Sequence, residues 1–265
     1  MMQEGKQKMK FYAFYFSPTG NCKKVASIVA KEFNNSEVID ITPQEARTKE
    51  YSIDKEDILF VVAPTYAGKL PNKILPELKN MFKTNGAKAI AVTLFGNRSF
   101  DNSLAELVSV LKDSNFSVIG AAALTSEHAF SNKLANGRPN TDDLAKLCSY
   151  VKERVSDNKE VTPIGDASAP YYTPLGLDEK PAMFLKAKPK TKDACVKCGA
   201  CVKACPVNSI EKDCVTVLGP CIKCQACIKV CPVGAKYLDD EAFLSHVSYL
   251  ENHYGTGIRE NYYAK

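Results

Sequence analysis

The chain has 265 residues, 45% of them apolar, and a formal net charge of +5. This apolar content suffices for a buried core and excludes a disordered chain, while the length suggests one large or two modest domains. No apolar run approaches the roughly 18–20 residues needed to cross a bilayer, and the charged start MMQEGKQKMK does not resemble a secretory signal. We therefore expect a cytoplasmic protein.

The first 160 residues alternate predicted strands and helices. Apolar runs predict strands at 10–17, 37–41, 58–63, 87–95 and 116–124. Apolar residues at helical spacing predict helices at 21–33, 71–82, 101–112 and 141–155, the last with Thr141 as its N-cap. This alternation favours an α/β fold in which an open, doubly wound, five-stranded parallel sheet has the strand order 2-1-3-4-5.

The remaining residues divide into three parts. Residues 161–192 contain five prolines interleaved with aromatic residues, which predicts a linker packed against a domain. Residues 193–238 hold nine of the eleven cysteines and are predicted to form a second, small α+β domain. Residues 239–265 are predicted to be a helical tail with apolar residues at Phe243, Leu244, Val247 and Leu250.

The cysteine-rich part is an internal repeat with an offset of 26 residues. Each half, 195–206 and 221–232, reads C-x2-C-x2-C-x3-C-P. In this pattern three cysteines bind one [4Fe–4S] cluster, and the fourth binds the other cluster. One cluster is thus assigned to Cys195, Cys198, Cys201 and Cys231, and the other to Cys221, Cys224, Cys227 and Cys205. Zinc is the alternative, but structural zinc sites use two C-x2-C pairs rather than two triples.

The eight cysteines resemble those of the bacterial two-cluster ferredoxin family. Cys214 and Cys148 are expected to be buried apolar thiols. Each cluster with its four thiolates adds about −2, which brings the net charge from +5 close to about +1. We therefore expect neither a nucleic acid nor a membrane partner.

Three loops after predicted strands point to a phosphate-bearing ligand. Residues 17–22 place hydroxyl groups and a glycine at a helix N-terminus, an arrangement that attracts phosphate. Residues 64–71 and 95–101 follow the next two buried strands, at the sheet edge where open α/β sheets bind ligands. The candidate cofactor-binding residues are Ser17, Thr19, Gly20, Asn21, Cys22, Pro64, Thr65, Tyr66, Gly68, Phe95, Gly96 and Asn97.

The first two loops resemble those of the flavodoxin family. The phosphate loop departs from the family pattern at Cys22, where a hydroxyl group is usual. The second loop resembles the family's P-T-Y-x-G sequence, in which an aromatic residue, here Tyr66, flanks the flavin ring. The resemblance implies a flavodoxin-like fold and a bound FMN, with His128 and Arg98 as further candidates near the ring.

The whole chain resembles a flavodoxin–ferredoxin fusion of anaerobic bacteria and archaea. The resemblance implies an electron-transfer protein that relays electrons between two clusters and FMN and exchanges them with another redox protein. One alternative is an enzyme, a flavin-dependent reductase of a small acceptor, with residues 125–140 as a pocket wall. The other is a flavodoxin domain without FMN that serves as a docking module. No catalytic residue is assigned.

Overall fold

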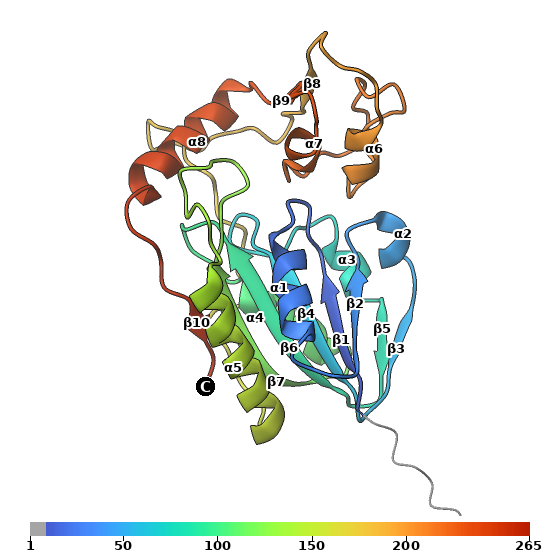
Figure 1. Cartoon of the computed structure of the whole chain (residues 1–265). Helices are drawn as coiled ribbons and strands as arrows, with labels where there is room; N and C mark the ends of the chain where they lie inside the picture. Colours follow the sequence, from blue (N-terminus) through green and yellow to red (C-terminus); the bar gives the residue numbers. More distant parts are fainter. Residues whose placement is uncertain (1–8) are drawn as a thin grey trace, which may run out of the picture.

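The computed structural model describes residues 9–265; residues 1–8, which belong to the charged start considered above, lie outside the described part. An α/β part occupies the lower half of Figure 1, and the cysteine-rich part lies over the carboxyl ends of its strands. No helix in the described part of the chain is long and apolar enough to cross a bilayer.

The α/β part contains the first twelve elements. They are β1 (Phe11–Tyr15), α1 (Asn21–Ala30), β2 (Ser36–Asp40), α2 (Gln44–Arg47), β3 (Tyr51–Ile53), β4 (Ile58–Pro64), α3 (Leu75–Leu78), β5 (Phe82–Thr84), β6 (Lys88–Phe95), α4 (Ser103–Asp113), β7 (Ser117–Thr125) and α5 (Thr141–Asp157).

The main sheet has the strand order β10-β7-β6-β4-β1-β2. The five predicted strands correspond to β1, β2, β4, β6 and β7, which pair in parallel. The prediction of a five-stranded, all-parallel sheet is wrong at one edge, because β10 (Tyr262–Tyr263) pairs antiparallel with β7. A two-residue strand close to the chain end carries too short a pattern to be recognised from the sequence.

The sheet is covered by helices on both faces. Side chains of α1 and α5 pack with alternate residues of β1, β4, β6 and β7 in one apolar cluster, and α4 packs on the opposite face in another. The N-cap of α5 is Asn140 rather than the predicted Thr141. Asn140 accepts a bond from the Asp143 N–H, and the Asp143 carboxylate accepts one from the Asn140 N–H, which forms a capping box.

The predicted helix at 71–82 is mostly absent. Only Leu75–Leu78 is helical, and Phe82–Thr84 forms β5, which pairs with β3 in a small parallel sheet. Pro76 would fall inside the predicted helix and lacks the N–H group that a longer helix needs there, which explains why apolar spacing alone misled the prediction.

The cysteine-rich part contains β8 (Lys190–Thr191), α6 (Ala200–Ala204), α7 (Ala226–Lys229) and β9 (Lys236–Tyr237), and β8 pairs antiparallel with β9. The tail forms α8 (Glu241–Tyr254) before β10. The predicted helical spacing is confirmed; the buried face of α8 carries Phe243, His246, Tyr249 and Leu250, whereas Leu244 is exposed.

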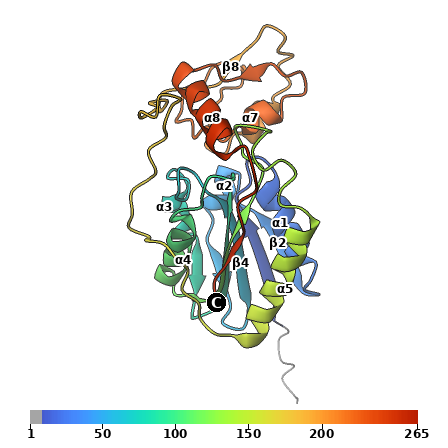
Figure 2. The same cartoon turned by 90° about the vertical axis from the view of Figure 1, so that its left-hand side faces the viewer.

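The segment between α5 and β8 runs along the outside of the α/β part and up to the cysteine-rich part (Figure 2). It is attached at several points. The buried Lys69 ammonium donates to the carbonyl oxygens of Ala167 and Ala169 at 2.6 and 2.9 Å, and the Tyr171 hydroxyl donates to Leu70 at 2.7 Å. Lys69 also pairs with the buried Glu106 carboxylate at 2.9 Å. These contacts hold the segment on the α/β surface.

Candidate functional site

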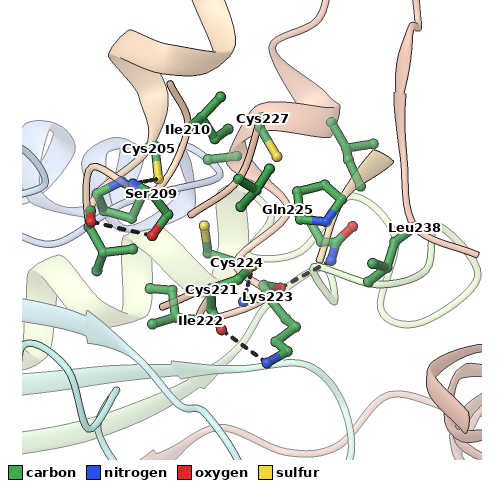
Figure 3. Close-up of a pocket in the computed structure, with 16 residues that line it drawn as sticks. Cys205, Ser209, Ile210, Cys221, Ile222, Lys223, Cys224, Gln225, Cys227 and Leu238 are labelled. Carbon is green, nitrogen blue, oxygen red and sulfur yellow. Dashed lines mark hydrogen bonds between the residues drawn. The ribbon is translucent and has the colours of Figure 1, made fainter. Parts of the chain in front are cut away.

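Each of two cavities in the cysteine-rich part is lined by four of the repeated cysteines. The first, which we call the outer cavity, is lined by Cys195, Cys198, Cys201 and Cys231, together with Cys214 and Lys236. The second, the inner cavity (Figure 3), is lined by Cys205, Cys221, Cys224 and Cys227 within a mostly apolar wall. These are the same two sets of four that the repeat assigned to separate clusters.

Backbone N–H groups donate to the cysteine sulfurs in the same way in both halves. The Lys197 N–H lies 3.4 Å from Cys195 Sγ, and the Lys223 N–H lies 3.4 Å from Cys221 Sγ. Likewise, Ser209 donates to Cys205 at 3.3 Å and Ala235 donates to Cys231 at 3.2 Å. Such bonds stabilise a thiolate, which is the form that binds metal. The donor set therefore fits iron–sulfur clusters.

The backbone of the repeat is held in an uncommon conformation. Lys197 and Lys223 have φ of 53° and 54°, in the left-handed region that non-glycine residues seldom adopt. Gly199 and Gln225 also correspond in the repeat, and both have positive φ. Because these turns aim successive cysteine side chains at one centre, strain of this kind at a binding loop is expected.

A site for a single metal ion differs in geometry from a site for an iron–sulfur cluster. Among residues 9–265, no group of three or more His, Cys, Asp or Glu side chains is arranged to hold a metal ion. In a cubane each thiolate binds a different iron, so its four ligands stand farther apart than the ligands of one ion.

A much larger cavity, of about 610 Å³, lies between the α/β part and the cysteine-rich part. We call it the central cavity. Ten of the twelve candidate cofactor residues line it: Ser17, Thr19, Asn21, Cys22, Pro64, Thr65, Tyr66, Gly68, Phe95 and Gly96. Gly20 and Asn97 do not line it. The carboxyl ends of β1, β4 and β6 thus converge on one space, as expected for an open α/β sheet.

The N-terminus of α1 opens toward the central cavity. Its N-cap is Gly20, with φ of 97°, which has no side chain to cap the helix, and in the first turn the Lys23 N–H donates a bond of 3.0 Å to the Ser17 hydroxyl. Burial raises the pKa of the neighbouring Cys22 thiol, so this side chain stays uncharged and does not repel an anion. The other N–H groups of the first turn and the positive helix end fit a phosphate.

Tyr66 is presented by a tight turn. Its N–H and carbonyl both bond to Lys69, at 2.8 and 3.1 Å, across Ala67 and Gly68, which have φ of 47° and 77°. A Cβ on Gly68 would lie 2.3 Å from the Asp101 carboxylate, so no larger residue fits there. Burial raises the pKa of Tyr66 well above its usual value, and the phenol therefore remains neutral.

His128 lies at the cavity wall beside Gly96. Its Nδ1 accepts a bond of 3.0 Å from the Phe130 N–H, which leaves the proton on Nε2. Burial, followed by the positive charges of neighbouring groups, lowers the pKa of His128 to about 3. A Cβ on Gly96 would lie 2.1 Å from the His128 ring, so Gly96 is needed to accommodate this histidine.

Asn97 holds the part of the chain that follows α8. The expected contact between its backbone and the flavin edge stays a prediction, whereas its side-chain amide donates to the carbonyl oxygens of Tyr254 and Gly257 at 2.7 and 3.0 Å. Its side-chain oxygen accepts a 2.9 Å bond from the Arg259 N–H. Asn97 therefore anchors the chain after α8, a role for which a single polar residue in a loop gives no local signal.

Much of the central cavity wall comes from residues that were not predicted. The proline-rich segment contributes Tyr171, Tyr172, Pro174, Phe184 and Leu185, and α8 contributes His246 and Leu250. The aromatic residues between the prolines were the available signal for the first group. Pro220, Cys221, Ile222 and Lys223 of the cysteine-rich part complete the wall.

Two stretches of the chain match family models described as 4Fe-4S binding domains, at residues 189–211 and 221–235. The cysteine-rich part is a pair of 4Fe-4S binding domains. No curated protein matches the chain.

Three solved structures show similarity to the chain. A flavodoxin from the domain Archaea is 13% identical, over 56% of this chain and 98% of that one, with a TM-score of 0.37. A Fusobacterium nucleatum flavodoxin bound to flavin mononucleotide is 14% identical, over 58% and 100%, with a TM-score of 0.38. Rubredoxin oxygen:oxidoreductase from the anaerobe Desulfovibrio gigas is 14% identical, over 56% and 37%, with a TM-score of 0.36.

Proposed function

We propose that the chain is an electron-transfer protein that relays electrons between two [4Fe–4S] clusters and an FMN. One observation carries this proposal: Cys221 lines both the inner cavity and the central cavity. A group bound by Cys221 would therefore lie beside a group bound in the central cavity. Ile222 strengthens this junction, because it packs against the apolar core of the α/β part.

In this proposal the cysteines that line each cavity are its ligands. Cys205, Cys221, Cys224 and Cys227 hold one cluster in the inner cavity, and Cys195, Cys198, Cys201 and Cys231 hold the other in the outer cavity. Residues 193–238 form the cluster domain and residues 1–160 the flavin domain, with 161–192 as the linker. Cys198 is exposed, so the outer cluster is the one that another redox protein would meet.

The central cavity is the FMN site. The N-terminus of α1, with Ser17, Thr19 and Asn21, binds the phosphate, and Tyr66 packs on the ring. FMN is preferred to FAD because the chain lacks a G-x-G-x-x-G motif for an adenosine half. A bound flavin exchanges one or two electrons whereas each cluster exchanges one, so the pair connects two-electron and one-electron chemistry.

The test is stopped-flow mixing of the anaerobic protein with a reduced one-electron donor, followed at flavin and cluster wavelengths. Cys221→Ser with Cys224→Ser should remove the inner cluster and slow flavin reduction sharply, while FMN remains bound. Cys195→Ser with Cys198→Ser is the matched pair for the outer cluster. Unchanged flavin reduction in a protein that has lost both clusters would exclude the relay.

A flavin-dependent reductase is the second candidate. It is favoured by the side chains that line the central cavity beyond the three predicted loops, among them His128, Phe130 and His246. These groups could form a compartment for a small acceptor. Steady turnover of such an acceptor by isolated protein and reduced ferredoxin would support this candidate, and transfer only to redox proteins would support the relay.

A further inference from the structure

Lys236 is a buried ammonium group in the cluster domain. It lies in β9 and is 3% exposed. Its Nζ donates a bond of 2.7 Å to the hydroxyl of Thr191, the residue opposite it in β8. Within residues 9–265, no carboxylate lies at ion-pair distance from Lys236. A cation removed from water without a counter-charge is strongly disfavoured.

One carboxylate in the surrounding loops, that of Asp213, is already engaged. It is exposed and accepts bonds from the Thr216 hydroxyl at 2.6 Å and from the N–H groups of Val215 and Thr216 at 2.9 Å each. The charges of Asp213 and Lys236 interact, but solvent screens the exposed carboxylate, so most of the compensation for the buried ammonium must come from elsewhere.

The negative charge that compensates Lys236 can come from a group bound in the outer cavity. Lys236 lines this cavity together with Cys195, Cys198, Cys201 and Cys231. A [4Fe–4S] cluster with its four thiolates carries a net negative charge. In a buried setting such a charge and an ammonium compensate each other.

The repeat supplies an internal comparison. The residue 26 positions before Lys236 is Ile210, which lines the inner cavity and is 5% exposed. Both residues follow the fourth cysteine of their half by five positions, and Ile210 forms the equivalent antiparallel bridge, with Val217. Two structurally equivalent positions thus present a cation to one cavity and an aliphatic group to the other.

We propose that Lys236 is the internal counter-ion of the outer cluster and makes that cluster the easier of the two to reduce. The inference rests on the proposed function, because it requires both clusters. Reduction adds a negative charge to a cluster, and a buried positive charge stabilises the reduced form more than the oxidised one. Lys236 is therefore a positioning residue that acts through its charge and does not bind iron. An electron from a partner protein would reside first on the outer cluster.

The experiment is an anaerobic potentiometric titration of the full chain, followed by electron paramagnetic resonance. Lys236→Ile makes the two halves alike, and Lys236→Arg retains the charge. Lys197→Met is the matched control, since this lysine adjoins Cys198 but is exposed, where water and salt screen its charge. Lys236→Ile should shift one reduction step to lower potential and bring the two steps closer together. Lys236→Arg should largely preserve the wild-type titration, and Lys197→Met should shift it less.

Measuring the iron content of each variant distinguishes a failure of the proposed function from a failure of this inference alone. If wild-type protein lacks labile sulfide, the proposed function fails and the inference with it. The inference alone fails if Lys236→Ile keeps the wild-type iron content and both reduction steps keep their wild-type potentials. It also fails alone if Lys197→Met shifts the reduction potentials as much as Lys236→Ile does. Loss of about half the iron in Lys236→Ile but not in Lys236→Arg would support a counter-ion. Equal iron loss in both variants would mean that the site needs the lysine's shape rather than its charge, and would overturn the inference.

Discussion

The Arg47 guanidinium donates a hydrogen bond of 2.6 Å to the carbonyl oxygen of Pro206, which lies 159 residues farther along the chain. Pro206 directly follows Cys205, so this bond joins the α/β part to a residue next to the inner cavity. Arg47 is 2% exposed, and its other nitrogens bind the Glu77 carboxylate and the carbonyl oxygens of Ile41 and Thr42.

We expect Arg47→Met to loosen the cluster domain from the α/β part. The change leaves buried acceptors without a donor, at a cost of about 2–4 kcal/mol in the free energy of unfolding. Arg154→Met is the matched control, because Arg154 is a buried arginine whose bonds stay within residues 119–159. Both variants should be destabilised in urea, but only Arg47→Met should speed protease cleavage in the 161–192 segment. Equal cleavage of the two variants at matched stability would contradict this role.

Gly20→Val should weaken FMN binding strongly, by about tenfold or more. Gly20 has φ of 97°, and no atom lies within 4 Å of a Cβ built there, so the cost is backbone strain that would distort the phosphate loop. Gly86→Val is the control, because Gly86 has φ of 84° and equally open surroundings but does not line the central cavity. A flavin-release titration should find altered affinity only in the first variant.

Thr19→Ala tests the same loop without backbone strain. Thr19 lines the central cavity, and loss of its hydroxyl removes one hydrogen-bond donor to a phosphate, worth about 1.5–3 kcal/mol. The Kd for FMN should rise accordingly while the free energy of unfolding of the flavin-free protein stays close to wild type. Wild-type affinity in both Thr19→Ala and Gly20→Val would place the phosphate elsewhere.

Anaerobically purified protein should contain about eight irons and eight acid-labile sulfides per chain, as two cubanes require. Cys224→Ser should lower both by about half. Cys148→Ser should leave both unchanged, since Cys148 is a buried thiol of α5. Stoichiometric zinc without labile sulfide would instead favour the zinc alternative.

The half-buried His128 should make stability depend on pH. Its ordinary pKa of 6.5 falls to about 3 in the folded protein, so below about pH 6.5 the unfolded chain binds a proton that the folded protein does not. Stability from this group is complete above about pH 6.5 and decreases toward pH 3, by at most about 1.4 kcal/mol per pH unit.

His128→Gln should reduce the difference in the free energy of unfolding between pH 7 and pH 5.5, measured in urea. His253→Gln, a change at a half-exposed histidine of α8, serves as the control. If the two variants keep the same dependence on pH as the wild type, another group is responsible for it.

Features that depend on local spacing could be predicted from the order of the amino acids alone. The offset of 26 residues assigned two sets of four cysteines, and each set lines one cavity, because three ligands of each set lie within seven residues. The α1 phosphate loop was recognisable for the same reason: hydroxyl groups, a glycine and a helix start are adjacent in the chain. The alternation of buried strands and helices likewise indicated the doubly wound sheet, since each element carries its own periodicity.

The contacts that join these local units became apparent only in the folded chain. The Arg47–Pro206 bond, the anchoring of the chain end by Asn97 and the walls of the central cavity all bring together residues far apart in sequence. The difference between Lys236 and Ile210 was visible in the repeat, but its meaning required knowing that each side chain is buried against a separate cavity. Such contacts depend on how elements pack, and packing leaves no periodic pattern in either partner's own segment.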